Sequence, residues 1–161
     1  MIILGLDPGT AILGWGLIDT GDRHQVDKMV CLGYGALTTD KSLSDSKRLV
    51  ALANGLRALF MQYTPDLVSV EKLFFFSNQK TVMTVSQARG VILMLAEEAG
   101  LEIVEFTPMQ VKQALTGYGK ADKQQMQQMC KVLLHLTEVP KPDDAADALA
   151  IAMTAAQTKR Y

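Results

Sequence analysis

The stretch IILGLDPGT at residues 2–10 joins a short apolar run to an acidic turn. The run has the length of a buried strand, and Asp-Pro-Gly is typical of a tight turn. A second apolar run, residues 67–70, also ends in an acid, Glu71. A carboxylate beside an apolar strand is costly unless something pairs with it. If the two strands are parallel neighbours, Asp7 and Glu71 lie together at one edge of a sheet, where such sheets bind ligands.

Hydrophobic periodicity extends this pattern along the chain. We expect strands at 2–7, 12–19, 26–38, 67–71 and 101–106, and helices at 43–63, 78–99, 108–115, 122–135 and 143–157. Short turns between the first three strands predict an antiparallel meander. Gly14 and Gly16 alternate with larger residues in the second strand, which indicates close approach of another backbone. The order βββαβαβααα predicts an α/β fold with a five-stranded mixed sheet and helices on both faces.

Length and composition indicate one globular domain, residues 1–161, with 48% hydrophobic residues and a mean hydropathy of +0.12. No apolar run approaches the ~20 residues of a membrane span. The N-terminus has no basic region typical of a signal peptide, so we expect a cytoplasmic protein without membrane contact. The net charge of −1 argues against a nucleic-acid partner, but residues 107–135 carry four lysines against one acid.

Two further acids, Asp144 and Asp147, lie three residues apart near the start of the last helix and share one face. Each acid has an ordinary explanation when taken alone. Asp7 suits a turn, Glu71 suits a strand that exits to solvent, and an Asp after proline suits a helix cap. Four carboxylates that converge would repel one another unless divalent cations neutralised them. Together they predict a Mg²⁺ site for phosphodiester chemistry.

Two other segments suggest contacts with DNA. The aromatic run 74–76 follows the strand that ends in Glu71, and it fits either a core or interface or a surface that stacks on unpaired bases. The loop 117–123 leads into a helix and carries Lys120 and Lys123, which suits phosphate binding or a plain connector.

The chain resembles the RuvC Holliday-junction resolvases along nearly its full length. The matching stretches are LGLDPGT at 4–10, GWGLI at 14–18, VSVEKLFF at 68–75, QARG at 87–90, TPMQVKQALTGYGKADKQQM at 107–126 and DDAADALAIA at 143–152. Their order and spacing also match the family. The resemblance implies an RNase H-like fold, in agreement with the element order.

The resemblance also implies a homodimeric endonuclease that nicks two strands of a four-way DNA junction in recombination and repair, with the branch-migration proteins RuvA and RuvB as partners. The family's catalytic and metal-binding carboxylates fall on Asp7, Glu71, Asp144 and Asp147. Asp143 is an additional neighbour, interpreted as a helix cap or an outer residue of the site. The candidate DNA-binding residues are Phe74, Lys80, Arg89, Lys112, Lys120 and Lys123.

The predicted mechanism is two-metal hydrolysis with two Mg²⁺ per subunit, for which Mn²⁺ is a plausible substitute. Asp7 would bridge the ions, Glu71 would bind the one that activates water, and Asp144 and Asp147 would complete the coordination. The products would carry 5′-phosphate and 3′-hydroxyl ends. The alternatives are a catalytically silent junction-binding dimer, an actin- or Hsp70-like nucleotide-binding domain, and an RNA-processing nuclease of the same fold.

Overall fold

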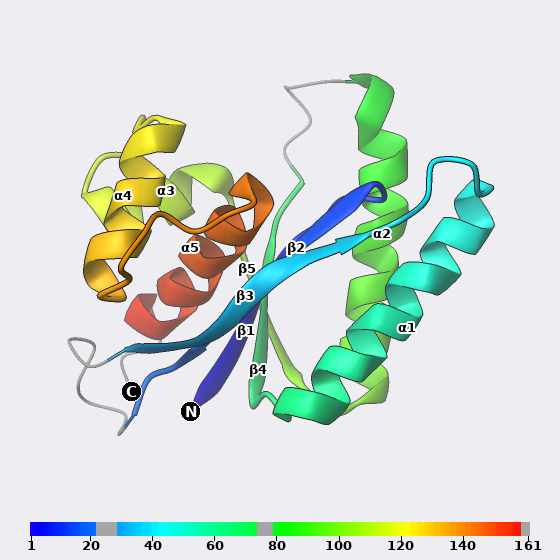
Figure 1. Ribbon diagram of the computed structural model, residues 1–161, viewed down its shortest axis with the longest axis horizontal. Coiled ribbons are helices and arrows are strands. Elements are labelled where there is room, and N and C mark those ends of the chain that lie inside the picture. The colour runs from blue at the N-terminus through cyan, green and yellow to red at the C-terminus, as the bar shows by residue number, and fades with distance from the viewer. Residues whose placement is uncertain (22–28, 74–78, 159–161) are drawn as a thin grey trace.

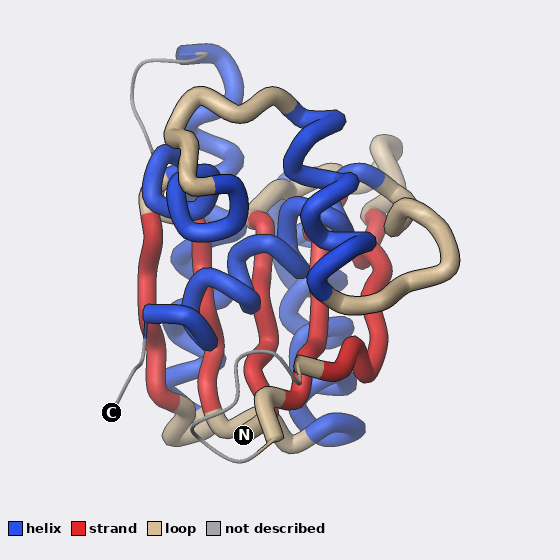
Figure 2. The backbone as a smooth tube through the Cα atoms, turned by 90° about the vertical axis from the view of Figure 1, so that its left-hand side faces the viewer, coloured by secondary structure: helices blue, strands red, loops and turns tan. Residues whose placement is uncertain are grey.

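The computed structural model describes residues 1–21, 29–73 and 79–158. Within them, one mixed sheet has the strand order β3-β2-β1-β4-β5, and Figure 2 shows its strands side by side. Antiparallel pairing joins β1 to β2 and β2 to β3, whereas β1 pairs parallel with β4 and β4 with β5. The predicted meander is therefore confirmed. The strands are β1 (Ile2–Asp7), β2 (Ile12–Asp19), β3 (Val30–Thr38), β4 (Leu67–Glu71) and β5 (Glu102–Phe106).

Helices cover both faces of the sheet, as the sequence predicts (Figure 1). One face carries α1 and α2, and the other carries α3, α4 and α5. The helices are α1 (Asp45–Tyr63), α2 (Gln79–Glu98), α3 (Pro108–Thr116), α4 (Lys123–Leu133) and α5 (Asp143–Thr158). The expected helices differ from these by at most two residues at each end. Part of the expected third strand, 26–38, lies outside the described residues.

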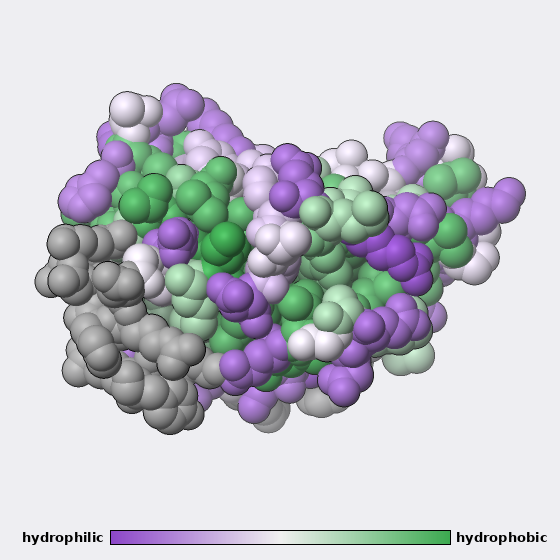
Figure 3. Space-filling model, turned by 90° about the horizontal axis from the view of Figure 1, so that it is seen from below, coloured by the Kyte–Doolittle hydropathy of each residue, from purple (hydrophilic) through white to green (hydrophobic). Residues whose placement is uncertain are grey.

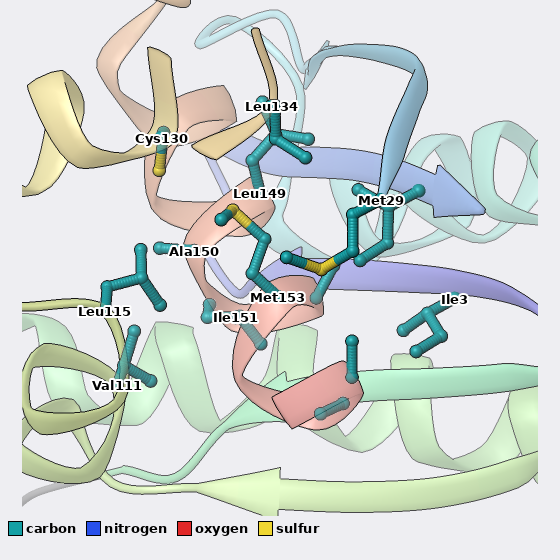
Figure 4. Close-up of a cluster of buried hydrophobic side chains, with 14 of the residues drawn as sticks. Ile3, Met29, Val111, Leu115, Cys130, Leu134, Leu149, Ala150, Ile151 and Met153 are labelled. Atoms are coloured by element: carbon teal, nitrogen blue, oxygen red, sulfur yellow. The ribbon is translucent and has the colours of Figure 1, made fainter. Parts of the chain in front are cut away.

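The hydrophobic core has two layers, one on each side of the sheet. Figure 4 shows the layer beneath α5, where Leu149, Ile151 and Met153 meet Ile3 of β1 and Val111 of α3. From Ala148 to Ala156 every residue of α5 is buried, and most of them are small. Small side chains allow this helix to approach the sheet closely.

Glycines in β1 and β2 permit that approach. A Cβ atom added to Gly14 would lie 2.1 Å from the carbonyl oxygen of Asp144, and one added to Gly16 would lie 2.6 Å from the backbone nitrogen of Leu149. Gly5, which pairs with Gly16 across the sheet, faces the backbone of α5 in the same way. The close approach predicted from Gly14 and Gly16 is thus confirmed. It sets the first turn of α5 directly on β2.

Figure 3 views the molecule from the end of the sheet at which the parallel strands begin. Hydrophilic and hydrophobic side chains are interspersed over the coloured part of this face. The acidic strand ends lie at the opposite end of the sheet. None of the helices in the described part of the chain has both the length and the hydropathy that a membrane crossing requires.

Candidate active site

Asp7 and Glu71 are the last residues of two neighbouring parallel strands. The register pairs Leu6 of β1 with Val70 of β4, so the next residue of each strand is the acid. Both acids are only partly exposed. The neighbour relation that the sequence left as an assumption is confirmed, and the two carboxylates share the carboxyl edge of the sheet.

The first turns of α5 bring two more acids to this edge. Gly14 pairs with Asp7 across β1 and β2, and the backbone of Asp144 packs against Gly14. Asp144 is therefore next to the end of β1, and Asp147 follows one turn further along the same helix. Strand ends and helix start together gather the acids from three distant parts of the sequence.

Burial, together with neighbouring carboxylates, raises the pKa values of Asp7, Glu71 and Asp147. Burial raises the pKa of Asp7 to about 8, and the charges of Glu71, Asp147 and Asp144 add to the effect, whereas Lys123 opposes it. Burial and the charge of Asp147 raise the pKa of Glu71 to about 7, against a lowering by Lys112. The pKa of Asp147 is also raised, chiefly by burial. Such shifts are typical of buried carboxylates that lie close together, and shifts of this kind cluster at functional sites.

The helices that carry Lys112 and Lys123, α3 and α4, both begin with a side-chain cap. The Thr107 hydroxyl accepts a hydrogen bond from the backbone N–H of Gln110 at the start of α3. The Asp122 carboxylate likewise accepts one from the backbone N–H of Gln125 at the start of α4, at 2.9 Å. Both starts are capping boxes, which hold the first helical turn in place. Lys123 is the first residue of α4, and its side chain reaches α5.

Lys123 makes two ion pairs with α5. Its Nζ lies 3.2 Å from Oδ2 of Asp143 and 3.6 Å from Oδ2 of Asp147. Burial acts to lower the pKa of Lys123, but the Asp143 hydrogen bond and the neighbouring carboxylates raise it overall. Asp143 also accepts a hydrogen bond from Gln127 of α4 at 2.9 Å. Its carboxylate therefore lies outside the pocket lining, paired with two residues of α4.

A pocket of about 240 Å³ lies between the acids and the lysines. Polar lining comes from Asp7, Glu71, Asp147, Lys112 and Lys123. The remaining wall is apolar and is supplied by α3, α4 and α5: Pro108, Val111, Met126, Ala150 and Ile151. Asp144 is beside the pocket and not in its lining.

The donor set of this pocket fits a hard divalent cation. Carboxylate oxygens are the ligands that Mg²⁺ prefers. Burial and neighbouring carboxylates raise the pKa values of Asp7 and Glu71, and a bound cation would oppose both effects. Within residues 1–21, 29–73 and 79–158, no three His, Cys, Asp or Glu side chains stand close enough together to enclose one metal ion as placed. Lys123 supplies the positive charge beside Asp147 in this arrangement.

The other predicted DNA contacts are more scattered. Lys120 is exposed in the connection between α3 and α4, three residues before Lys123. Arg89 of α2 forms a partly buried ion pair with Glu105 of β5, a partner that the sequence did not reveal. Lys80 lies in the first turn of α2, but its side chain is outside the described residues, as is the whole of Phe74. Sequence reasoning also missed Gln127, because nothing in its own surroundings singles it out.

Comparison with known proteins gives consistent matches over nearly the full chain. The model of the family "Crossover junction endodeoxyribonuclease RuvC" matches residues 3–155. Proteins of that name from Heliobacterium modesticaldum and Alkaliphilus oremlandii are 52% and 50% identical to the chain. The first alignment covers 98% of the chain and 95% of the relative, and the second covers 100% and 96%.

Solved structures of RuvC resemble this chain as well. Thermus thermophilus RuvC superposes with a TM-score of 0.90 at 34% identity, covering 99% of this chain and 96% of that one. The same protein in complex with a Holliday junction substrate also gives 0.90, covering 99% and 95%. The yeast mitochondrial Holliday junction resolvase Ydc2 has a TM-score of 0.66 at 14% identity, covering 96% and 78%, and shares the fold alone.

The sheet topology and the likeness to Thermus thermophilus RuvC define an RNase H-like fold with an acidic sheet edge. The family-model match and the relatives of about 50% sequence identity show which family within this fold class the chain belongs to. The chain belongs to the RuvC family of crossover junction endodeoxyribonucleases. This membership replaces the actin- or Hsp70-like alternative.

Proposed function

We propose that this chain, acting as one nuclease domain over residues 1–161, resolves four-way DNA junctions in recombination and repair. It would hydrolyse one phosphodiester bond in each of two opposed strands. The observation that carries the proposal is the pocket in which Asp7, Glu71 and Asp147 face Lys112 and Lys123. Membership of the RuvC family and the Thermus thermophilus complex with a Holliday junction substrate support it.

We infer that Asp7, Glu71, Asp144 and Asp147 hold two Mg²⁺ per subunit, for which Mn²⁺ can substitute. The support is the donor chemistry of the pocket and the raised pKa values of Asp7 and Glu71. When bound, such cations supply positive charge to the reacting phosphate and make a bound water more acidic. Water adds to phosphorus, the bond from phosphorus to the 3′-oxygen breaks, and that oxygen takes a proton. The products are 5′-phosphate and 3′-hydroxyl ends.

Positive side chains would hold the DNA over the pocket. Lys112 and Lys123 line the pocket and are suited to the phosphates next to the scissile bond, and the exposed Lys120 suits a phosphate further along. Phe74 would stack on a base near the opened centre of the junction. Lys80 is a further candidate contact. Arg89 is a weaker one, because Glu105 already occupies its guanidinium.

A homodimer would place two such pockets on a two-fold junction, one for each opposed strand. The resemblance to the family extends the proposal to the branch-migration proteins RuvA and RuvB and to a cytoplasmic location. Both are tested by experiments separate from catalysis, such as co-purification and cell fractionation.

A nicking assay tests the proposal. A labelled synthetic four-way junction and a linear duplex of the same sequence are incubated with the protein in Mg²⁺ or in EDTA. We expect paired, symmetric nicks in the junction alone, only with Mg²⁺, and with ends that DNA ligase reseals. Tight binding without nicks over several junction sequences would instead indicate the silent-dimer alternative. Preferential cutting of structured RNA would indicate the RNA-processing alternative.

A further inference from the structure

The ammonium of Lys123 lies between two carboxylates of α5 that differ in depth. Asp143 and Asp147 are four residues apart and thus share a helix face. Lys123 is 3.2 Å from the outer carboxylate, whose side chain is 59% exposed, and 3.6 Å from the inner one, which is 40% exposed. The inner carboxylate lines the pocket, and the outer one does not. The lysine therefore bridges the pocket and its rim.

The outer carboxylate is itself held in place. Gln127 of α4 donates a hydrogen bond from Nε2 to Oδ1 of Asp143 at 2.9 Å, while Lys123 takes Oδ2. Lys123 and Gln127 are four residues apart on α4 and share one helix face. That face therefore contacts both carboxylate oxygens of Asp143. Exposed ion pairs contribute little to stability. The contacts of Asp143 with Lys123 and Gln127 are therefore better explained by a role in positioning than by a contribution to the free energy of unfolding.

Lysine and a divalent cation compete for the inner carboxylate. A cation bound at Asp147 would be only a few ångströms from the Lys123 ammonium, and like charges at that range repel strongly. A lysine whose sole partner was Asp147 would have to be released into solvent before a cation could bind. With Asp143 present, the lysine needs only to give up the longer of its two contacts.

We propose that Asp143 is a positioning residue that anchors Lys123 outside the pocket, so that a divalent cation can replace the lysine at Asp147 without expelling it from the site. This inference rests on the proposed function, because it assumes that cations bind at the acids. The anchored ammonium then stays at the rim, where a DNA phosphate would approach. Asp143 acts through Lys123 and does not itself touch the reacting atoms.

The test is a double-mutant cycle on cation binding in the absence of DNA. Mn²⁺ is titrated into the wild-type protein, Lys123→Gln, Asp143→Asn and the double variant, and free Mn²⁺ is followed by its EPR signal. Lys123→Gln removes the competitor, so we expect binding to tighten by about tenfold. Asp143→Asn should weaken binding by about tenfold when Lys123 is present. In the Lys123→Gln background it should weaken binding only about twofold, the effect of one screened charge about a Debye length away.

The ratio of these two weakening factors, about fivefold, is the measured coupling between Asp143 and Lys123. Equal factors in the two backgrounds would overturn the inference, as would tighter Mn²⁺ binding by Asp143→Asn or unchanged binding by Lys123→Gln. Asp143→Glu keeps a carboxylate and should restore at least half of the lost affinity in logarithmic terms. A value no better than that of Asp143→Asn would also count against the anchor.

Two controls separate this inference from the proposed function. Glu97→Gln removes an exposed charge near the end of α2, at the opposite end of the sheet, and should leave Mn²⁺ binding unchanged. Asp7→Asn should abolish tight Mn²⁺ binding. If the wild type does not bind Mn²⁺, or binds it equally without Asp7, both the metal site and the inference fail. Binding that depends on Asp7 together with an additive cycle overturns the anchor alone.

Discussion

Replacing Gly14 with alanine tests whether the contact between β2 and α5 positions the acids. The added Cβ would lie 2.1 Å from the carbonyl oxygen of Asp144 and 2.5 Å from its carbonyl carbon. Non-bonded contacts between carbon atoms are about 3.5 Å or longer. Both obstructing atoms are backbone, so no side-chain rotation can relieve the overlap. The first turn of α5 must therefore move away from β1 and β2 by more than about 1 Å.

That shift has a cost in stability and a larger one in catalysis. Overpacking of this kind lowers the free energy of unfolding by about 1–3 kcal/mol. A displacement of about 1 Å at reacting groups lowers the rate of the chemical step by about 100-fold. We expect Gly14→Ala to remain folded at 25 °C, to bind a four-way junction in EDTA within about threefold of wild type, and to cleave it about 100-fold more slowly.

The assays are urea denaturation, junction binding in EDTA and single-turnover cleavage in Mg²⁺. Gly33→Ala is the matched control, because it makes the same change in β3 and its Cβ would meet nothing closer than 3.4 Å. It should cleave within about threefold of wild type. Gly14→Ala with cleavage and stability equal to those of Gly33→Ala would refute the claim that this contact positions Asp144 and Asp147.

Three further predictions address charge, stacking and pH. Lys123→Ala should weaken junction binding and reduce the slope of log K against log[salt] by about one phosphate contact. Lys47→Ala on α1 should change neither the affinity nor the slope. An unchanged slope for Lys123→Ala would show that Lys123 does not contact a phosphate. Phe74→Ala should slow cleavage by more than about tenfold with a melting temperature within a few degrees of wild type, and the reverse pattern would favour a core role. Because folding raises the pKa values of Asp7 and Glu71 to about 8 and about 7, the folded state binds more protons than the unfolded state above about pH 4. The melting temperature in EDTA should therefore fall as pH rises from 5 to 8. The fall should be smaller in Asp7→Asn, and Mg²⁺ should oppose it. A constant melting temperature would contradict the raised pKa values.

The fold was predictable because its signals are local. Apolar runs such as 67–70 end at turn residues or acids, and the Ala-rich segment 143–157 shows helical spacing. The start of α3 also has a local signal, because Thr107 caps it and Pro108 is its first residue. Gly14 and Gly16 indicated a close approach, although not the helix that makes it.

Contacts between separate elements were not predictable in the same way. The link of Lys123 and Gln127 to Asp143 depends on the angle at which α4 meets α5, which no periodicity encodes. Arg89 was predicted to contact DNA, but its ion pair with Glu105 depends on how α2 packs on β5. A charged side chain in sequence looks the same whether it awaits a ligand or already has a partner in the fold.

The proposed function requires that the acidic pocket cut four-way junctions. The most direct test compares wild type with Asp7→Asn on a labelled junction in Mg²⁺, with junction binding measured on the same samples. We expect paired, symmetric nicks by the wild type. Asp7→Asn should bind the junction within about threefold of wild type and make no detectable nicks. Substantial residual nicking by Asp7→Asn, or wild-type binding without any nicks, would contradict it.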